Sequence, residues 1–126
     1  PWRERTEAAL LRSIDLGIMP LNDSPWQRGK CGFKLIQYMA CGRPVIASPV
    51  GANNDIVTGD TGLIAADENA WLQAFHRLAD NPALRRSLGA AGRARVEQRY
   101  SLQHWAARIV EMLDCAYDLG RSRFQP

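Results

Sequence analysis

The sequence predicts an α/β protein with a partial, doubly wound, Rossmann-like parallel sheet, followed by C-terminal helices. Three short segments are apolar throughout, as strands buried on both faces of a parallel sheet are. Segments with helical periodicity alternate with them, which favours a sheet covered by helices on both sides. About three strands can be counted, fewer than a full sheet of this kind holds. We therefore expect residues 1–126 to form a single partial domain, and the start without methionine suggests a piece of a longer chain.

The first third of the chain predicts a helix, a strand, a loop and a second helix. Residues 3–13 have the spacing of a helix with one charged and one apolar side. Residues 14–21, IDLGIMPL, predict the first buried strand, and the turn formers of 22–29 predict a loop. Residues 31–41 are expected to be helical, with Gly42 at the position after the helix that favours glycine.

Two more strands are expected in the middle of the chain. Residues 44–48, PVIAS, predict the second strand, and residues 63–66, LIAA, predict the third. Between them, Asn53 or Asn54 is expected to cap a short helix that runs through Thr58. The tight turn GDTG then leads into the third strand.

The last part of the chain predicts three helices with clear start signals. Asp67 is expected to cap a helix at 68–80, Pro82 to start a helix that ends at Arg99, and Ser101 to cap the last helix. The predicted apolar stripes are Trp71, Leu72, Phe75 and Leu78 in the first of these helices, and Leu102, Trp105, Ile109, Met112 and Ala116 in the last.

Composition and charge exclude several classes of protein. Apolar residues make up 46% and charged residues 23%, which are ordinary globular values, so disorder is excluded. No apolar run reaches the roughly 18 residues of a membrane-spanning helix. The net charge is only +3, and aromatic residues do not alternate with the C-terminal arginines, so we expect no nucleic-acid partner. Cys31, Cys41 and Cys115 lack a metal-like spacing; they predict buried small side chains in a reducing compartment.

The helix at 31–41 carries a candidate ligand site. In open α/β sheets, ligands bind beyond the carboxyl ends of the strands, where helix amino ends offer free N–H groups. Gly29 and Gly32 allow a ligand to approach the backbone closely. Lys34 and Gln37 are three residues apart, hence on one face and about 4.5 Å apart along the axis. This order of amides, ammonium and carboxamide matches a diphosphate joined to a ribose.

A purely structural interpretation of the same two residues stays open. Lys34 could extend its ammonium to solvent past apolar surface, and Gln37 could bond a backbone carbonyl. Neither role needs a ligand.

The segment GKCGFKLIQYMACGRPVIASPVG, followed by DIVTGDTGLI, closely resembles the donor-binding segment of the family 4 (group 1) glycosyltransferases. The preceding DLGIMPL and the closing helices, from NPALRRSLGAAGRARVEQRY onward, are similar to the flanking pieces of that family. The resemblance covers about Trp2 to Asp114. It implies the C-terminal half of the donor domain of a GT-B enzyme, in which two Rossmann-like domains face each other across a cleft.

The resemblance also implies roles for individual residues. Gly32, Phe33 and Lys34 match positions around the donor diphosphate, and Gln37 matches the position that binds the ribose. Two further positions, Gly29 and Cys31, match the region of the donor sugar. The family commonly has glutamate where this chain has Gly29 and Gln37. A glutamine can still bond a ribose hydroxyl, whereas a glycine cannot hold sugar hydroxyls.

The resemblance implies a glycosyltransferase that moves a sugar from a nucleotide diphosphate to an acceptor with retention of configuration. No cofactor and no metal are expected besides the nucleotide-sugar substrate. The acceptor, a glycan or lipid-linked sugar, is expected to bind through the N-terminal domain that this chain lacks, so the chain alone is expected to be inactive. We expect a cytoplasmic protein in polysaccharide biosynthesis, with peripheral membrane association at the inner face left open. A nucleotide-sugar epimerase of the same architecture and a non-catalytic nucleotide-binding or interaction module remain alternatives.

Overall fold

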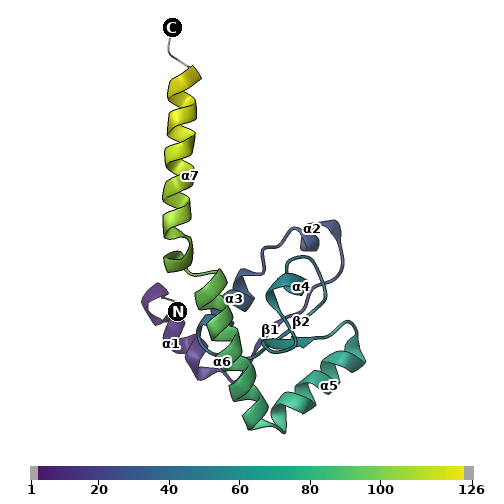
Figure 1. Cartoon of the computed structure of the whole chain (residues 1–126). Coiled ribbons are helices and arrows are strands. Elements are labelled where there is room, and N and C mark those ends of the chain that lie inside the picture. The colour runs from purple at the N-terminus through teal and green to yellow at the C-terminus, as the bar shows by residue number, and fades with distance from the viewer. Residues whose placement is uncertain (1–2, 124–126) are drawn as a thin grey trace.

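The computed structural model describes residues 3–123 of the 126-residue chain, so Trp2, where the resemblance begins, lies outside the described residues. Helices and strands follow one another along the whole described chain (Figure 1). They are α1 (Glu4–Ser13), β1 (Gly17–Met19), α2 (Pro25–Arg28), α3 (Phe33–Ala40), β2 (Val45–Ala47), α4 (Asn53–Ile56), β3 (Gly62–Ile64), α5 (Glu68–Ala79), α6 (Pro82–Arg99) and α7 (Leu102–Arg123).

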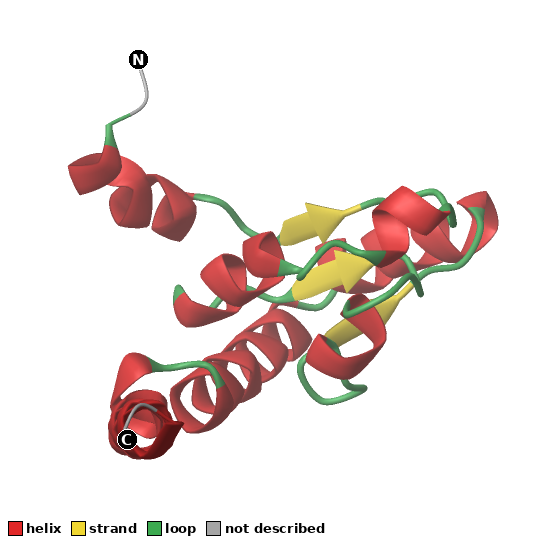
Figure 2. Cartoon of the chain, turned by 90° about the horizontal axis from the view of Figure 1, so that it is seen from above, coloured by secondary structure: helices red, strands yellow, loops and turns green. Residues whose placement is uncertain are grey.

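The three predicted strands form one parallel sheet in the order β1-β2-β3. Val45 of β2 is in register with Gly17 of β1 and with Gly62 of β3. All three carboxyl ends therefore lie at the same edge, and Figure 2 shows the three arrows pointing the same way. The predicted fold class is confirmed, although each strand is shorter than its apolar segment.

Both faces of the central strand are covered, as the run of apolar residues in β2 predicts. On one face, Leu35 and Met39 of α3 pack with Val45 in a buried cluster. Ile46 points to the opposite face and packs with a second cluster that includes Leu78 of α5. This layering fixes α3 against the sheet, with its amino end at the carboxyl edge of the strands.

Several predicted helix ends are confirmed by their hydrogen bonds. Asp67 Oδ1 accepts from the Ala70 amide at 2.8 Å, and Ser101 Oγ accepts from the His104 amide at 3.2 Å. Gly42, just after α3, has a φ of 69°, which an L side chain rarely adopts.

Two predictions for the loops were wrong. The segment 22–29 contains the helix α2, whose N-cap Ser24 and following Pro25 are standard helix-start residues. Asn53 does not cap α4, because the N-cap is Ala52 and no side chain caps the helix. The amide group of Asn53 instead donates to the Ser48 carbonyl at 3.0 Å, across the loop that follows β2.

The prediction of the buried face of α5 was only partly right. Leu78 is fully buried, but Leu72 is 55% exposed, and the small Ala74 takes its place in the core. Ala70 and Trp71 pack against the same cluster. A small side chain thus fills this position in the cluster, a feature that hydrophobicity alone does not reveal.

The last helix differs more from expectation. Its apolar residues have the predicted helical spacing, but α7 extends away from the rest of the chain (Figure 1) and Met112 is 64% exposed. The expected burial of the cysteines was also wrong for two of them, since Cys31 and Cys115 are exposed and Cys41 is half-buried.

Candidate functional site

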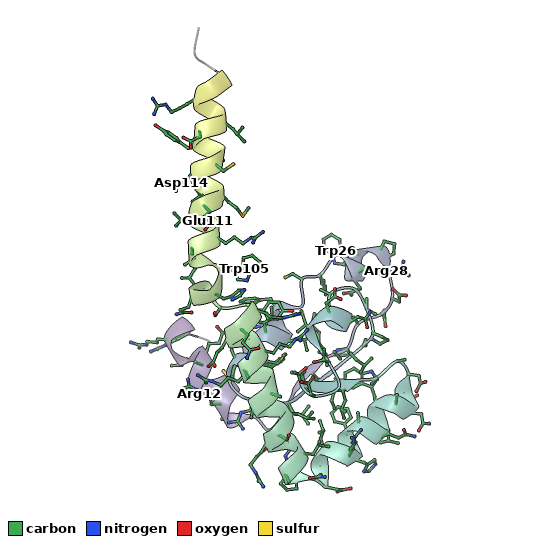
Figure 3. The ribbon with its side chains drawn as sticks, viewed as in Figure 1. Arg12, Trp26, Arg28, Trp105, Glu111 and Asp114 are labelled. Carbon is green, nitrogen blue, oxygen red and sulfur yellow. The ribbon has the colours of Figure 1, made fainter. Side chains whose placement is uncertain are left out.

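The connection from β1 to α3 crosses the carboxyl edge of the sheet and is held in shape by polar contacts. Ser24 Oγ accepts a hydrogen bond from the Gln27 amide at 3.3 Å and so starts α2. Arg28 at the end of α2 forms a bidentate ion pair with Asp23: its Nε donates to Oδ1 at 2.6 Å and its Nη2 to Oδ2 at 2.9 Å. Trp26 and Arg28 both lie on α2 (Figure 3), and Trp26 is 82% exposed. The loop therefore has a fixed course while its outer side stays open to solvent.

The Asp23–Arg28 ion pair shifts the pKa of both groups. The hydrogen bond from Arg28 lowers the pKa of Asp23 below its ordinary value, and the charge of the guanidinium acts in the same direction. Conversely, the Asp23 carboxylate raises the pKa of Arg28. The pair is fully charged at neutral pH.

The amino end of α3 is open to a ligand. Gly32, its N-cap, has a φ of 67°, and no side chain caps the helix. The backbone N–H groups of Phe33 and Lys34 have no acceptor among residues 3–123. Gly29, Cys31 and Phe33 are all exposed. Gly32 itself is buried, but the residues around it leave one side of the helix end exposed, and its free amides and partial positive charge suit an anion.

The buried side of this helix end packs against α4. A Cβ atom on Gly32 would lie 2.3 Å from the Cδ1 of Ile56 and 3.5 Å from the Oδ1 of Asn53. Asn53 is 1% exposed, and its Oδ1 has no hydrogen-bond partner in the described chain. An unused acceptor is therefore buried directly beneath the helix end.

Lys34 and Gln37 lie on the same side of α3, as predicted. Both side chains contact one carboxylate oxygen, the Oε1 of Glu7 on α1: Lys34 Nζ at 3.6 Å and Gln37 Nε2 at 3.2 Å. The opposite side of α3 carries the fully buried Leu35 and Met39. The helix thus presents one apolar face to the sheet and one polar face to α1.

The structural interpretation of these two residues is half right. The side chain of Lys34 is 57% exposed, so its ammonium does reach solvent. Gln37 does not bond a backbone carbonyl, because its amide nitrogen donates to Glu7 and its Oε1 is buried without a partner in the described residues. Glu7 was missed by the sequence analysis. Thirty residues separate it from Gln37, and no local motif signals a contact of that range.

A polar recess lies at the same edge of the sheet, on the α5 side. It has a volume of about 300 Å³ and is lined by residues that follow each strand, among them Asn22, Ser48 and Asp67. Gln27 from α2 also lines it, and the Oε1 of Gln27 is buried and has no partner in the described part of the chain. The carboxyl edge therefore carries a polar recess on the α5 side of β2 and the uncapped end of α3 on the other side, as expected for the ligand side of an open sheet.

Two kinds of site are not found in the described chain. Among residues 3–123, no group of three or more His, Cys, Asp and Glu side chains is placed to hold a metal ion. None of the described helices is both long enough and apolar enough to span a membrane.

The fold and the site together define an α/β chain with an uncapped helix end at the carboxyl edge of a parallel sheet. The family profile described as "Glycosyl transferases group 1" matches residues 2–81, well over half of the chain. The chain belongs to this family of glycosyltransferases, as the resemblance in the sequence predicted.

Curated relatives agree with this assignment. A GDP-mannose-dependent monoacylated alpha-(1-6)-phosphatidylinositol monomannoside mannosyltransferase from Corynebacterium glutamicum is 36% identical over 84 residues, which is 65% of this chain and 22% of the relative. A D-inositol 3-phosphate glycosyltransferase from Pseudarthrobacter chlorophenolicus is 33% identical over 114 residues, covering 88% of this chain and 26% of the relative. The chain thus spans about a quarter of the length of the curated relatives it matches.

Solved structures share the fold. Sucrose-phosphate synthase from Thermosynechococcus elongatus superposes with a TM-score of 0.76 at 30% identity, over 87% of this chain and 27% of its own. HepE from Anabaena, solved in complex with UDP, superposes with a TM-score of 0.67 at 18% identity, over 84% of this chain and 29% of its own. Both superpositions confirm the predicted fold class.

Proposed function

We propose that the protein containing this chain is a retaining glycosyltransferase, and that this chain binds the nucleoside diphosphate of the sugar donor. The observation that carries the proposal is the open amino end of α3, where free amides of Phe33 and Lys34 meet the exposed ammonium of Lys34. An anion bound there gains both the helix dipole and a charged donor. Membership of the glycosyltransferase family supplies the reaction class.

The chemistry follows from where charge develops. As the bond between the sugar and the diphosphate breaks, negative charge builds on the leaving diphosphate. Amides fixed at a helix end and a nearby ammonium stabilise that charge without rearranging, so they act more strongly on the transition state than on the bound donor. In this proposal, the amides of Phe33 and Lys34, which follow Gly32, and the ammonium of Lys34 hold the diphosphate.

The proposal also assigns residues to the ribose and to the transferred sugar of the donor. Gln37 lies one turn further along the same face of α3, beside the position of the ribose. The exposed Gly29 and Cys31 flank the helix end on the side of the transferred sugar. No cofactor and no metal are invoked.

The acceptor side is proposed from the relatives. Their names describe transfer to a phosphatidylinositol mannoside and to inositol 3-phosphate. We infer an acceptor of the glycan, inositol phosphate or lipid-linked class. It would be bound by a part of the protein beyond this chain, which faces the site across a cleft and works in the cytoplasm at the inner face of the membrane. The isolated 126 residues are then inactive in transfer.

A donor screen on the whole protein tests the function. Labelled GDP- and UDP-sugars are incubated with and without candidate acceptors, and the anomeric configuration of the product is read by NMR. Transfer with retention in the presence of an acceptor supports the proposal. Conversion of the donor sugar without any acceptor identifies an epimerase instead. Binding of the nucleotide with no turnover of any donor identifies a non-catalytic module, in which the glycine at position 29 marks lost chemistry.

A further inference from the structure

We propose that Glu7 is a donor-binding residue: its carboxylate accepts hydrogen bonds from the two neighbouring hydroxyls of the nucleotide's ribose, and Gln37 holds that carboxylate in place. The inference deepens the proposed function and depends on it. It moves the ribose contact from the carboxamide of α3 to a carboxylate supplied by α1.

The contacts of Glu7 leave one of its oxygens free. Oε1 receives two contacts, from Gln37 Nε2 at 3.2 Å and from Lys34 Nζ at 3.6 Å. No donor among residues 3–123 reaches Oε2. The side chain of Glu7 is 24% exposed, so it is shielded on most sides but still accessible. A fixed, accessible carboxylate oxygen is thus available next to the proposed diphosphate site.

Gln37 has no comparable freedom. Its amide nitrogen is used by Glu7, and its Oε1 is buried without a partner in the described chain. Rotating the carboxamide by half a turn would place its oxygen against the carboxylate oxygen of Glu7, and two acceptors repel each other. The amide orientation is therefore set by Glu7. Gln37 is a positioning residue for that carboxylate rather than a direct ligand.

The chemistry of the ligand favours a carboxylate at this point. A ribose presents two adjacent hydroxyl donors, and an ionised carboxylate accepts hydrogen bonds only. Bonds to a charged acceptor are stronger than bonds to a neutral carboxamide. Lys34 lies one turn nearer the amino end of α3 than Gln37, so its ammonium stands between the carboxylate and the diphosphate. At 3.6 Å the Lys34–Glu7 contact is loose enough for the ammonium to bind phosphate as well.

The contact between Glu7 and Lys34 also allows the opposite role, in which Glu7 weakens nucleotide binding, and the two roles can be distinguished by experiment. If the Glu7 carboxylate only neutralised Lys34 and repelled the diphosphate, removing its charge would strengthen nucleotide binding. The two roles therefore predict opposite signs for one substitution.

Calorimetric titration of the full-length protein decides between them. The probes are GDP and UDP and their 2′-deoxy counterparts, and the variants are Glu7→Gln and, as a matched control, Glu111→Gln on the exposed part of α7 (Figure 3). We expect the wild type to prefer the ribonucleotide, and Glu7→Gln to bind it roughly tenfold more weakly while binding the deoxynucleotide almost unchanged. Gln37→Leu should shrink the same preference, because it releases the carboxylate. Lys34→Ala should weaken both nucleotides equally, and Glu111→Gln should change neither.

Three results would overturn the inference. Tighter binding of both nucleotides by Glu7→Gln assigns Glu7 the blocking role. An unchanged preference for the ribonucleotide removes Glu7 from the ribose contact while leaving the proposed function intact. Failure of the wild type to bind either diphosphate removes the proposed function and this inference together. Equal melting temperatures of the variants and the wild type establish that the affinities are compared between folded proteins.

Discussion

A Cβ atom on Gly32 would lie 2.3 Å from the Cδ1 of Ile56, so the start of α3 packs directly against α4. Ile56 is 3% exposed and has little room to move. Gly32 also has a φ of 67°, in the left-handed region. The left-handed conformation therefore requires glycine at this position, and an added Cβ would also displace the end of the Ile56 side chain.

Gly32→Ala should lower the free energy of unfolding by at least about 1–2 kcal/mol, which is the usual cost of the left-handed conformation alone. Urea unfolding measures the change. Gly59→Ala is the control, since no atom lies within 4 Å of its added Cβ and its φ is not positive. That variant should stay within about 0.5 kcal/mol of the wild type. Equal stability of the two variants would show that neither the left-handed conformation of Gly32 nor its contact with Ile56 requires a glycine at this position.

The buried face of α5 gives a second comparison. Leu78 is fully buried whereas Leu72 is 55% exposed, although both belong to the stripe that the sequence suggested. Leu78→Ala should cost about 2–5 kcal/mol of unfolding free energy through lost burial and the cavity left behind. Leu72→Ala should cost no more than about 0.5 kcal/mol. Similar losses in the two variants would mean that α5 packs through its predicted stripe after all.

The ion pair of the α2 loop predicts a pH response. Because Arg28 lowers the pKa of Asp23 in the folded chain, the contribution of the pair to stability is present above the ordinary aspartate pKa. It is lost as the pH falls through the lowered value. An NMR titration of the side-chain carboxyl groups should show Asp23 titrating below the ordinary range, and Arg28→Gln should return it there.

Asp60 is the internal control for that titration. Its pKa is lowered mainly by the hydrogen bond from Thr58, so Arg28→Gln should leave it unchanged. If Asp23 titrates normally in the unmodified chain, the loop is not held by this pair in solution.

The strands and most helix ends were predicted correctly, because each is determined by residues that are close together in the sequence. The apolar segment around Ile46 is a strand since both faces of β2 are covered. Asp67 and Ser101 cap helices whose first turns follow immediately. The helix α2 was missed even though Ser24 and Pro25 form a recognisable helix start. Its four residues are too few to show an apolar period.

The remaining errors come from contacts between distant segments. Asn53 looks like a helix cap, but its amide group is used by the Ser48 carbonyl, so tertiary structure overrides the local preference. The exposure of α7 also depends on what surrounds it and not on its own spacing. In the candidate site, Lys34 and Gln37 were identified from their spacing, whereas Glu7 was not. Which helix lies beside α3 depends on the packing of the whole chain.

The central claim is that the amino end of α3 and Lys34 bind a nucleoside diphosphate, and Lys34→Ala tests it most directly. Lys30→Ala is the matched control, since Lys30 is an exposed lysine just before the helix with no ion pair in the described chain. Titration of GDP and UDP by calorimetry should show binding about tenfold or more weaker in Lys34→Ala than in the wild type, at equal melting temperature, and almost unchanged in Lys30→Ala. Equal affinity of Lys34→Ala and the wild type would contradict the account.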